Sequence, residues 1–347
     1  MAKLDARKLT GEIRKNNIGG AYFLYGSELY LLTRCLERLL QKAVPSPNEF
    51  NPERFEGEKG ALDLSALEDA VDNLPFMASS KTVVVHDLNP EQLAAEDTKR
   101  LQKLVENLPE NVILVFYVTG FEVNLKTSRK TQNFIKFMEK AGTVGEFSPL
   151  SKPDLAKFLI DQAAKRQCFL SAAAADRMID RSGSDLTNLL SELDQLIGFT
   201  GEGEITVASV DALVPQTMDA TAFDLANTLL RGNLSAALGI VGELKAQRAE
   251  PIMVAGALNS AFVDLYRAKC ALAAGANTAQ VTADFGYNPR VRFRVDNAFR
   301  SAGRMELSRL RQGIRCLHAL DLTLKSSRAD AFECLEQTLV KIHSGIE

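Results

Sequence analysis

The sequence has few of the residues that build metal sites and nucleophilic sites. Its five cysteines stand singly, at Cys35, Cys168, Cys270, Cys316 and Cys334, and no C-x-x-C pair occurs. The three histidines, His86, His318 and His343, are also far apart. Neither set has the spacing of metal ligands, and an odd, scattered set of cysteines is typical of reduced thiols in the cytoplasm. We therefore expect no metal site and no disulfide framework.

The sequence also has no long apolar run and no excess of positive charge. No stretch approaches the roughly 20 apolar residues that span a bilayer, and the first residues, MAKLDAR, have no apolar leader. We expect a soluble cytoplasmic protein with no membrane partner. The formal net charge is −3, which argues against an autonomous nucleic-acid binder. Any contact with DNA is then expected to be local or to occur within a larger assembly.

Nucleotide-binding and catalytic motifs are missing as well. A P-loop needs a second glycine, a lysine and a Ser or Thr after the first strand, whereas here Gly26 is followed by Ser27, Glu28 and Leu29. A carboxylate at position 28 would repel a phosphate. The run VVVHD ending at Asp87 looks like a magnesium-binding strand end, but leucine follows it where a catalytic glutamate would stand, so we expect an ordinary exposed strand end. Neither G-x-S-x-G nor HExxH occurs. ATP hydrolysis, cofactor binding and catalysis by this chain are not expected.

The first 147 residues alternate strand and helix patterns. Apolar runs predict strands at residues 21–25, 82–86, 112–118 and 143–147. A helix is expected at residues 65–74, with Ser65 and Glu68 as a capping box and Pro75 as its stop. This alternation predicts an α/β domain with a mostly parallel sheet at residues 1–147.

The rest of the chain is predicted to be helical. A small helical domain at residues 148–215 is expected to hold helices near 151–166, 171–181 and 184–199, the first opened by Ser151. Residues 216–347 form a predicted helical bundle. Its clearest helix covers residues 307–325, where apolar residues recur every three or four positions and Asp321 can pair with Lys325. The fold class is thus α/β plus all-α, in three domains.

Several motifs, taken in order along the chain, resemble the delta subunits of bacterial DNA polymerase III clamp loaders. They are YFLYGSELY at 22–30, DNLPFMASSKTVVV at 72–85, EFSPL at 146–150, SGSDL at 182–186, SEL at 191–193, TAFDL at 221–225, and the spaced pair Asp321 and Lys325. Each motif is weak singly, but their order and spacing together are specific. The resemblance covers nearly the whole chain.

The resemblance implies an AAA+-like, three-domain architecture with a degenerate P-loop, a three-helix lid and a C-terminal collar. It implies a subunit that binds and opens the ring-shaped beta sliding clamp without hydrolysing ATP, as a non-catalytic part of a DNA-directed DNA polymerase holoenzyme. The implied partners are the clamp, the ATPase subunits gamma/tau, delta prime and, within the assembly, primed DNA. The likeness implies no cofactor.

The resemblance also points to a clamp-binding element after the expected helix at 65–74. The matching positions are Leu74, Pro75, Phe76 and Met77. An exposed aromatic beside a flexible methionine suits burial in a partner's pocket. From the residues alone, packing of Phe76 under its own helix is the commoner arrangement, and the resemblance favours clamp contact. Met77 departs from the second aromatic that is common in the family.

A second candidate site is a run of arginines near the start of the last third of the bundle. DNA or a neighbouring subunit is a possible partner for Arg290, Arg292, Arg294, Arg300 and Arg304. An ordinary solvated helix face is the alternative, because Val291, Val295, Ala298 and Ala302 fall on one helical face.

Three other functions stay open at this point. A divergent AAA+ NTPase would need the missing glycine and lysine, and an independent DNA-binding module fits poorly with a pI of about 5.8. The delta prime subunit typically carries a zinc-binding cysteine cluster and an S-R-C motif, and neither occurs in this sequence.

Overall fold

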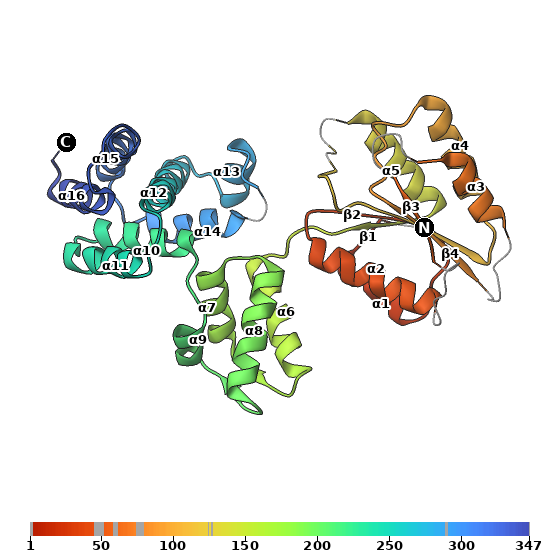
Figure 1. The fold of residues 1–347 in the computed structure, drawn as a ribbon, viewed down its shortest axis with the longest axis horizontal. Helices are drawn as coiled ribbons and strands as arrows, with labels where there is room; N and C mark the ends of the chain where they lie inside the picture. The colour runs from red at the N-terminus through yellow and green to blue at the C-terminus, as the bar shows by residue number, and fades with distance from the viewer. Residues whose placement is uncertain are drawn as a thin grey trace. The chain divides into compact units, whose positions relative to one another are not determined.

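The computed structural model describes residues 3–44, 52–57, 62–73, 80–123, 125, 128–288 and 291–346. The chain divides into two compact units, Met1–Pro149 and Leu150–Glu347. Figure 1 shows the first unit as a sheet with helices and the second as helices almost throughout. The fold class predicted from the sequence, α/β plus all-α, is confirmed.

A six-stranded sheet forms the centre of the first unit. Its strands are β1 (Lys3–Asp5), β2 (Gly20–Tyr25), β3 (Glu53–Glu56), β4 (Lys81–His86), β5 (Val112–Tyr117) and β6 (Thr143–Glu146). Their order is β1-β6-β2-β5-β4-β3, and every neighbouring pair is parallel. All strands therefore run in one direction. The side of the sheet where the strands start is called here the N-terminal edge, and the side where they end is called the C-terminal edge.

The four strands predicted from apolar runs correspond to β2, β4, β5 and β6, and these are the central strands with one neighbour on each side. The two border strands were missed. In β3 partly buried residues alternate with exposed ones, so the strand has no apolar run. Strand β1 has only three residues, which is too short to give a period.

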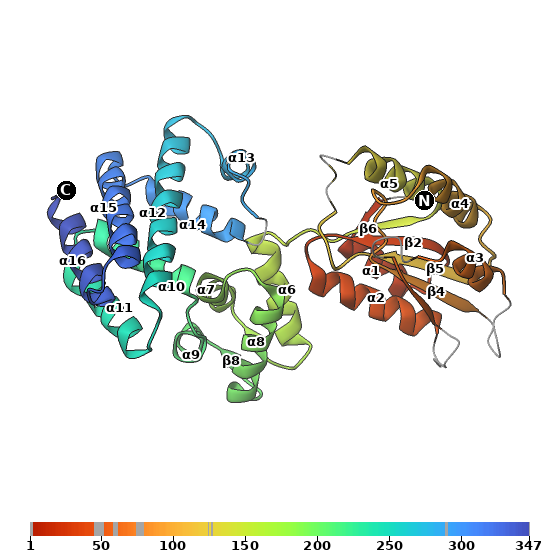
Figure 2. The ribbon, with the colours of Figure 1, turned by 45° about the horizontal axis from the view of Figure 1, so that its top comes forward.

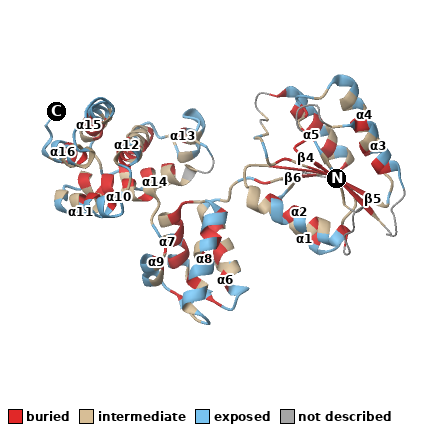
Figure 3. Ribbon diagram, viewed as in Figure 1, coloured by how far each residue is buried: buried red, intermediate tan, exposed pale blue. Residues whose placement is uncertain are grey.

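Helices cover both faces of this sheet. On one face α1 (Ala6–Arg14) and α2 (Leu29–Ala43) pack on Tyr22 and Leu24 of β2. On the other, α3 (Leu64–Asp72), α4 (Ala95–Glu106) and α5 (Arg129–Ala141) pack on Phe23 and Phe116. Figures 2 and 3 show these helix layers and the buried strands between them. Burial on both faces explains why the central strands are apolar without alternation.

The beginning of α3 corrects a prediction. Asp63, not Ser65, is its N-cap, and its carboxylate accepts the backbone N–H groups of Ser65 and Ala66 at 3.0 and 3.1 Å. The helix ends at Asp72, two residues earlier than expected. Aspartate caps a helix as well as serine does, and Ser65 and Glu68 are then free for tertiary contacts.

The second unit begins with a small group of helices: α6 (Lys152–Ala164), α7 (Ala172–Ser182), α8 (Leu186–Thr200) and α9 (Val207–Leu213). Ser151 caps α6 as predicted, accepting the N–H of Asp154. Two short parallel strands, β7 (Phe169–Leu170) and β8 (Glu204–Ile205), were not predicted. With two residues each, they are too short to give a sequence signal.

Seven further helices complete the second unit: α10 (Met218–Leu230), α11 (Leu234–Ala246), α12 (Pro251–Ala273), α13 (Thr278–Asp284), α14 (Arg292–Ala302), α15 (Leu307–Ser326) and α16 (Ala331–Ser344). One core cluster joins buried residues of α10, α11, α12, α14, α15 and α16. Lys325 and Asp321 form the predicted ion pair at 2.7 Å. Because α6–α9 and these helices fall in one compact unit, the predicted division at residues 215 and 216 stays a prediction. No helix within the described ranges is long and apolar enough to cross a membrane.

Candidate functional site

The loop after β2 stands where a phosphate-binding loop would be expected, and it is packed against the chain that follows β6. Gly26 has φ +144°, and a side chain there would place its Cβ 2.1 Å from the carbonyl oxygen of Phe147. The backbone N–H of Glu28 donates to that same oxygen at 2.9 Å, and Phe147 N–H donates to Tyr25 at 2.8 Å. A phosphate cradle needs backbone N–H groups that point outward. Here at least one of them is engaged within the protein.

Asp87 follows the end of β4, which β5 separates from β2 in the sheet, and the sequence predicted it to be exposed. That prediction is wrong, since Asp87 is only 2% exposed. Its carboxylate accepts the backbone N–H groups of Thr119 and Gly120 at 2.7 and 2.9 Å, and its own N–H donates to Tyr117 at 2.7 Å. Asp87 has a φ of +54°, a conformation that Asp tolerates better than most residues. The side chain ties the end of β4 to the loop after β5.

His86 adds to the same closed network. Its Nδ1 lies 2.9 Å from Glu56, and its Nε2 lies 2.7 Å from the hydroxyl of Thr119 and 3.2 Å from the carboxylate of Asp87. Its ring stacks on Tyr117 at 4.6 Å. Among the described residues, no group of three or more His, Cys, Asp or Glu side chains is arranged to hold a metal ion. The C-terminal edge therefore uses its polar groups to join strands.

Helix α3 approaches the opposite, N-terminal edge. Leu64, Leu67, Ala70 and Val71 bury one side of it in the core. On its other side Arg100 of α4 makes a fork to the carboxylate of Glu68, at 3.0 and 2.6 Å, and also donates to the Ser65 hydroxyl at 3.1 Å. The hydrogen bond from Arg100 lowers the pKa of Glu68. Two faces of a nine-residue helix are thus fixed.

The predicted clamp-binding residues Leu74, Pro75, Phe76 and Met77 lie outside the described residues. Both ends of the segment are well defined. Asn73 ends α3 in an extended conformation, with φ −67° and ψ 137°. The chain is described again at Ser80, whose hydroxyl donates to Ala43 of α2 at 3.2 Å. Lys81 follows, 7% exposed, with its ammonium 2.9 Å from Glu53.

The arginines predicted to contact DNA or a subunit lie in different surroundings. Arg290 is outside the described residues, and Arg292 is the first residue of α14. Arg294 binds within the protein, with its guanidinium 2.8 Å from Asp264, which is 4% exposed. Arg300 lies 3.4 Å from Asp180, and Arg304 is exposed.

The network around Arg294 was missed from the sequence. The phenol of Tyr287 donates to Asp264 at 2.5 Å and accepts from Arg267 at 2.9 Å. Burial, with a further contribution from the Asp264 carboxylate, raises the pKa of Tyr287. These partners are 20 to 30 residues apart in the chain, which no local pattern could reveal. Because Arg294 neutralises a buried carboxylate, it is a structural residue in this unit.

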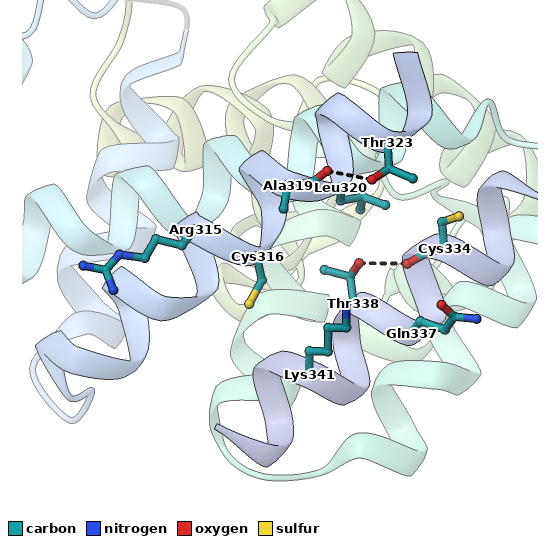
Figure 4. A pocket seen from close by; sticks show the side chains of 9 residues that line it. All are labelled: Arg315, Cys316, Ala319, Leu320, Thr323, Cys334, Gln337, Thr338 and Lys341. Carbon is teal, nitrogen blue, oxygen red and sulfur yellow. Dashed lines mark hydrogen bonds between the residues drawn. The ribbon is translucent and has the colours of Figure 1, made fainter. Parts of the chain in front are cut away.

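A groove between α15 and α16 is a further feature that the sequence did not indicate. It has a volume of about 340 Å³ and is lined by Arg315, Cys316, Ala319, Leu320, Thr323, Cys334, Gln337, Thr338 and Lys341. Figure 4 shows these side chains along the two helices. The hydroxyls of Thr323 and Thr338 donate to carbonyl groups one turn earlier in their own helices, at 2.9 and 2.8 Å.

Known proteins similar to this chain cover almost all of it. It is 26% identical over 340 residues to DNA polymerase III subunit delta of Bacillus subtilis, covering 95% of this chain and 94% of that one. DNA polymerase III subunit gamma/tau of Mycoplasma pneumoniae is 22% identical over 210 residues, 60% of this chain and 29% of that protein. The solved structure of the Bacillus subtilis DNA clamp loader delta protein has a similar fold, with a TM-score of 0.72, 23% identity and coverage of 98% and 99%.

Two family models match most of the first unit and the later part of the second. Residues 22–148 match the model of the DNA polymerase III delta subunit, and residues 219–342 match that of its C-terminal domain. The first match includes the closed C-terminal edge and α3, and the second includes α10 to α15 and most of α16. This chain therefore belongs to the delta-subunit family of the DNA polymerase III clamp loader.

Proposed function

We propose that this delta subunit binds the ring-shaped beta sliding clamp through Leu74, Pro75, Phe76 and Met77, and opens it for loading onto primed DNA. The observation that carries the proposal is the anchoring of α3 immediately before them. The helix is held by its buried face and by the fork from Arg100 to Glu68. Because α3 is already fixed, the helix itself loses no freedom when the residues after it bind a partner. Burial of a Phe and a Met contributes roughly 3–5 kcal/mol.

We also propose that the subunit does this without hydrolysing ATP. The support lies at the C-terminal edge of the sheet. Gly26 is in contact with Phe147, the Glu28 N–H is engaged, and one carboxylate oxygen of Asp87 accepts two backbone N–H groups. An ATPase needs this edge to hold phosphates and magnesium. The neighbouring gamma/tau subunits would supply hydrolysis, with delta prime completing the loader through the helices of residues 216–347.

Binding to the purified beta clamp from the same source tests the clamp proposal. We expect the wild-type chain to bind, and Phe76→Ala/Met77→Ala to weaken binding by about a hundredfold or more, since ~3 kcal/mol corresponds to that factor. The matched control is Phe199→Ala/Met253→Ala, which removes the same two side-chain types from positions 71% and 64% exposed in the second unit. Circular dichroism checks that each variant folds.

The outcomes separate the parts of the proposal. Absence of wild-type binding would overturn clamp binding by this subunit. Equal binding by wild type and the Phe76/Met77 variant would place the contact on other residues. Equal weakening by both double variants would indicate a general loss of apolar surface rather than a specific element.

A divergent AAA+ NTPase is the second candidate, because the chain also resembles a gamma/tau subunit over 210 residues. It requires nucleotide binding by the isolated chain, which equilibrium binding of a fluorescent ATP analogue would measure. Saturable binding that ATP displaces would favour this candidate over a non-hydrolysing subunit.

A further inference from the structure

A basic hollow lies between α1 and α2, on the face of the sheet opposite α3. It has a volume of about 360 Å³ and is lined by Ile13, Arg14, Arg38, Gln41 and Lys42. This set of residues is called the α1–α2 hollow below. Figure 2 shows the two helices side by side. Arg14 and Lys42 lie in the last turn of their helices, and both are exposed.

The three cations of the hollow differ from the other cations around these helices. Lys8, Lys15 and Arg34 lie at 3.9, 3.1 and 3.1 Å from the carboxylates of Asp5, Glu12 and Glu37 respectively. Within the described part of the chain, Arg14, Arg38 and Lys42 have no carboxylate partner. The local acidic groups are thus paired with other cations. Among the described residues, three positive charges without a carboxylate partner thus lie at one hollow of a chain whose net charge is −3.

We propose that the α1–α2 hollow binds the phosphodiester backbone of a nucleic acid. Two guanidinium groups present fork-shaped donors that match phosphate oxygens, Lys42 adds a point charge, and Gln41 adds a neutral donor. The only apolar residue of the lining, Ile13, is 2% exposed. An acidic protein partner would also bring apolar groups that need a place to be buried. The accessible groups of this lining are all polar, which favours the phosphate backbone of a nucleic acid, a ligand with regularly repeated charges.

Helix stabilisation does not account for all three cations. A cation in the last turn of a helix interacts favourably with the helix dipole, which explains Arg14 and Lys42 individually. Arg38 lies a turn before Lys42 and is partly buried. The C-terminal ends of α1 and α2 also weaken anion binding there, so a single cation would bind a phosphate poorly, whereas three are sufficient to reverse the local potential.

The position of the hollow gives a second reason, which rests on the proposed function. Helices α1 and α2 both lead back to the N-terminal edge, because each connects the end of one strand to the start of another parallel strand. Ala43, next to Lys42, accepts the hydroxyl of Ser80, which lies three residues after Met77, the last residue of the segment proposed to bind the clamp. A clamp loaded onto DNA at that segment brings nucleic acid close to the hollow.

The test compares two triple variants of the full chain in binding to a fluorescent primer–template DNA, by anisotropy over a series of salt concentrations. Arg14→Gln/Arg38→Gln/Lys42→Gln removes the hollow's cations. Lys8→Gln/Lys15→Gln/Arg34→Gln removes three paired cations from the same region and changes the net charge equally. We expect the hollow variant to bind about tenfold or more weakly at low salt, with a salt slope smaller by about 2–3. The control variant should stay within about twofold of wild type.

Each other outcome overturns the proposal. Equal losses in the two variants would mean that only overall charge matters. Absence of DNA binding by the wild-type chain at low salt would exclude the site. If polyglutamate binds the wild type but not the hollow variant, and DNA binding is the same for both, the hollow binds an acidic protein instead. Clamp binding by the same variants is measured in parallel. DNA binding tests the hollow, and clamp binding by the wild-type chain tests the clamp proposal. The two proposals can therefore fail separately: a chain that binds the clamp but not DNA contradicts only the hollow, and one that binds DNA but not the clamp contradicts only the clamp proposal.

Discussion

The two edges of the parallel sheet in the first unit differ in how their polar groups are used. At the C-terminal edge, the Glu28 N–H, the Asp87 carboxylate and the His86 ring all bond within the protein. At the N-terminal edge, Arg14 and Lys42, in the last turns of α1 and α2, have no carboxylate partner in the part of the chain that the structure describes. Parallel sheets commonly bind ligands at the C-terminal edge. The sites that we propose for partners of this chain lie toward the other one.

The comparison teaches that two edges of one sheet can use their polar groups in different ways. At the C-terminal edge the backbone of Gly26 lies close to that of Phe147. The edge then contributes stability, and new function is free to develop elsewhere. Substitutions at the two edges should therefore have different consequences.

The largest effect is expected from Gly26→Ala. Its Cβ would lie 2.1 Å from the Phe147 oxygen, and the φ of +144° is unfavourable for alanine. We expect the free energy of unfolding to fall by about 4 kcal/mol or more, measured by urea denaturation. Gly11→Ala is the control, because nothing lies within 4 Å of its Cβ position and alanine favours the helix by up to about 1 kcal/mol. A Gly26→Ala protein as stable as wild type would show that the loop after β2 is not packed tightly against Phe147.

Asp87→Ala should have the next largest effect. It leaves the N–H groups of Thr119 and Gly120 without their acceptor in a buried place, and we expect a loss of about 3 kcal/mol in unfolding free energy. Asp87→Asn keeps an acceptor oxygen and tolerates the positive φ, so its cost should be about 1–2 kcal/mol. Asp72→Ala, at an exposed position, serves as the control. Loss of function with full stability would instead indicate a catalytic or metal-binding role.

A smaller, pH-dependent effect is expected from Glu68→Gln, in the middle of α3. The hydrogen bond from Arg100 lowers the pKa of Glu68 below its ordinary value of 4.5. The pair therefore stabilises the folded state fully above pH 4.5, and this contribution disappears as the pH falls through the lowered pKa. Urea denaturation should show wild type more stable than the variant at pH 7 and equal to it in strong acid.

The Arg100→Gln background provides the control for that pair. There Glu68→Gln should have no pH-dependent effect, because the guanidinium that lowers the pKa is gone. A pH dependence that persists in this background would assign the stabilisation to another partner of Glu68.

The smallest effect is expected from ATP itself. With the loop after β2 packed on Phe147, millimolar ATP with magnesium should shift the melting temperature of the isolated chain by less than about 1 °C, since only a ligand that binds the folded state stabilises it. Thermal denaturation with and without ATP measures this. A shift of several degrees would mean that the C-terminal edge still binds nucleotide and would favour the divergent NTPase.

Much of the fold could be predicted from local patterns, and the exceptions have clear causes. The central strands β2, β4, β5 and β6 were found because burial on both faces makes each one an apolar run. Strand β3 was missed because only alternate residues are covered. The cap of α3 was assigned to Ser65 rather than Asp63 because both residue types cap helices and the two positions are only two residues apart.

The candidate sites were less predictable than the fold. The arginine run suggested one basic surface, yet Arg294 lies against Asp264, and Arg300 lies 3.4 Å from Asp180, a residue 120 positions away. The α1–α2 hollow was not predicted, because Arg14 and Arg38 are separated by a strand and two loops. The segment of Leu74 to Met77 was identified through resemblance and stays a prediction.

The sequence by itself determined the parallel α/β unit, the helical remainder, and the lack of a P-loop, because periodicity, turn residues and missing motifs act over a few neighbouring positions. Tertiary structure decided which charges are neutralised. It buried Asp87 under two N–H groups, placed Arg294 on a buried carboxylate, and brought Arg14, Arg38 and Lys42 to one hollow. Electrostatic partners are chosen by distance in space, and distance in space depends on the packing of whole elements.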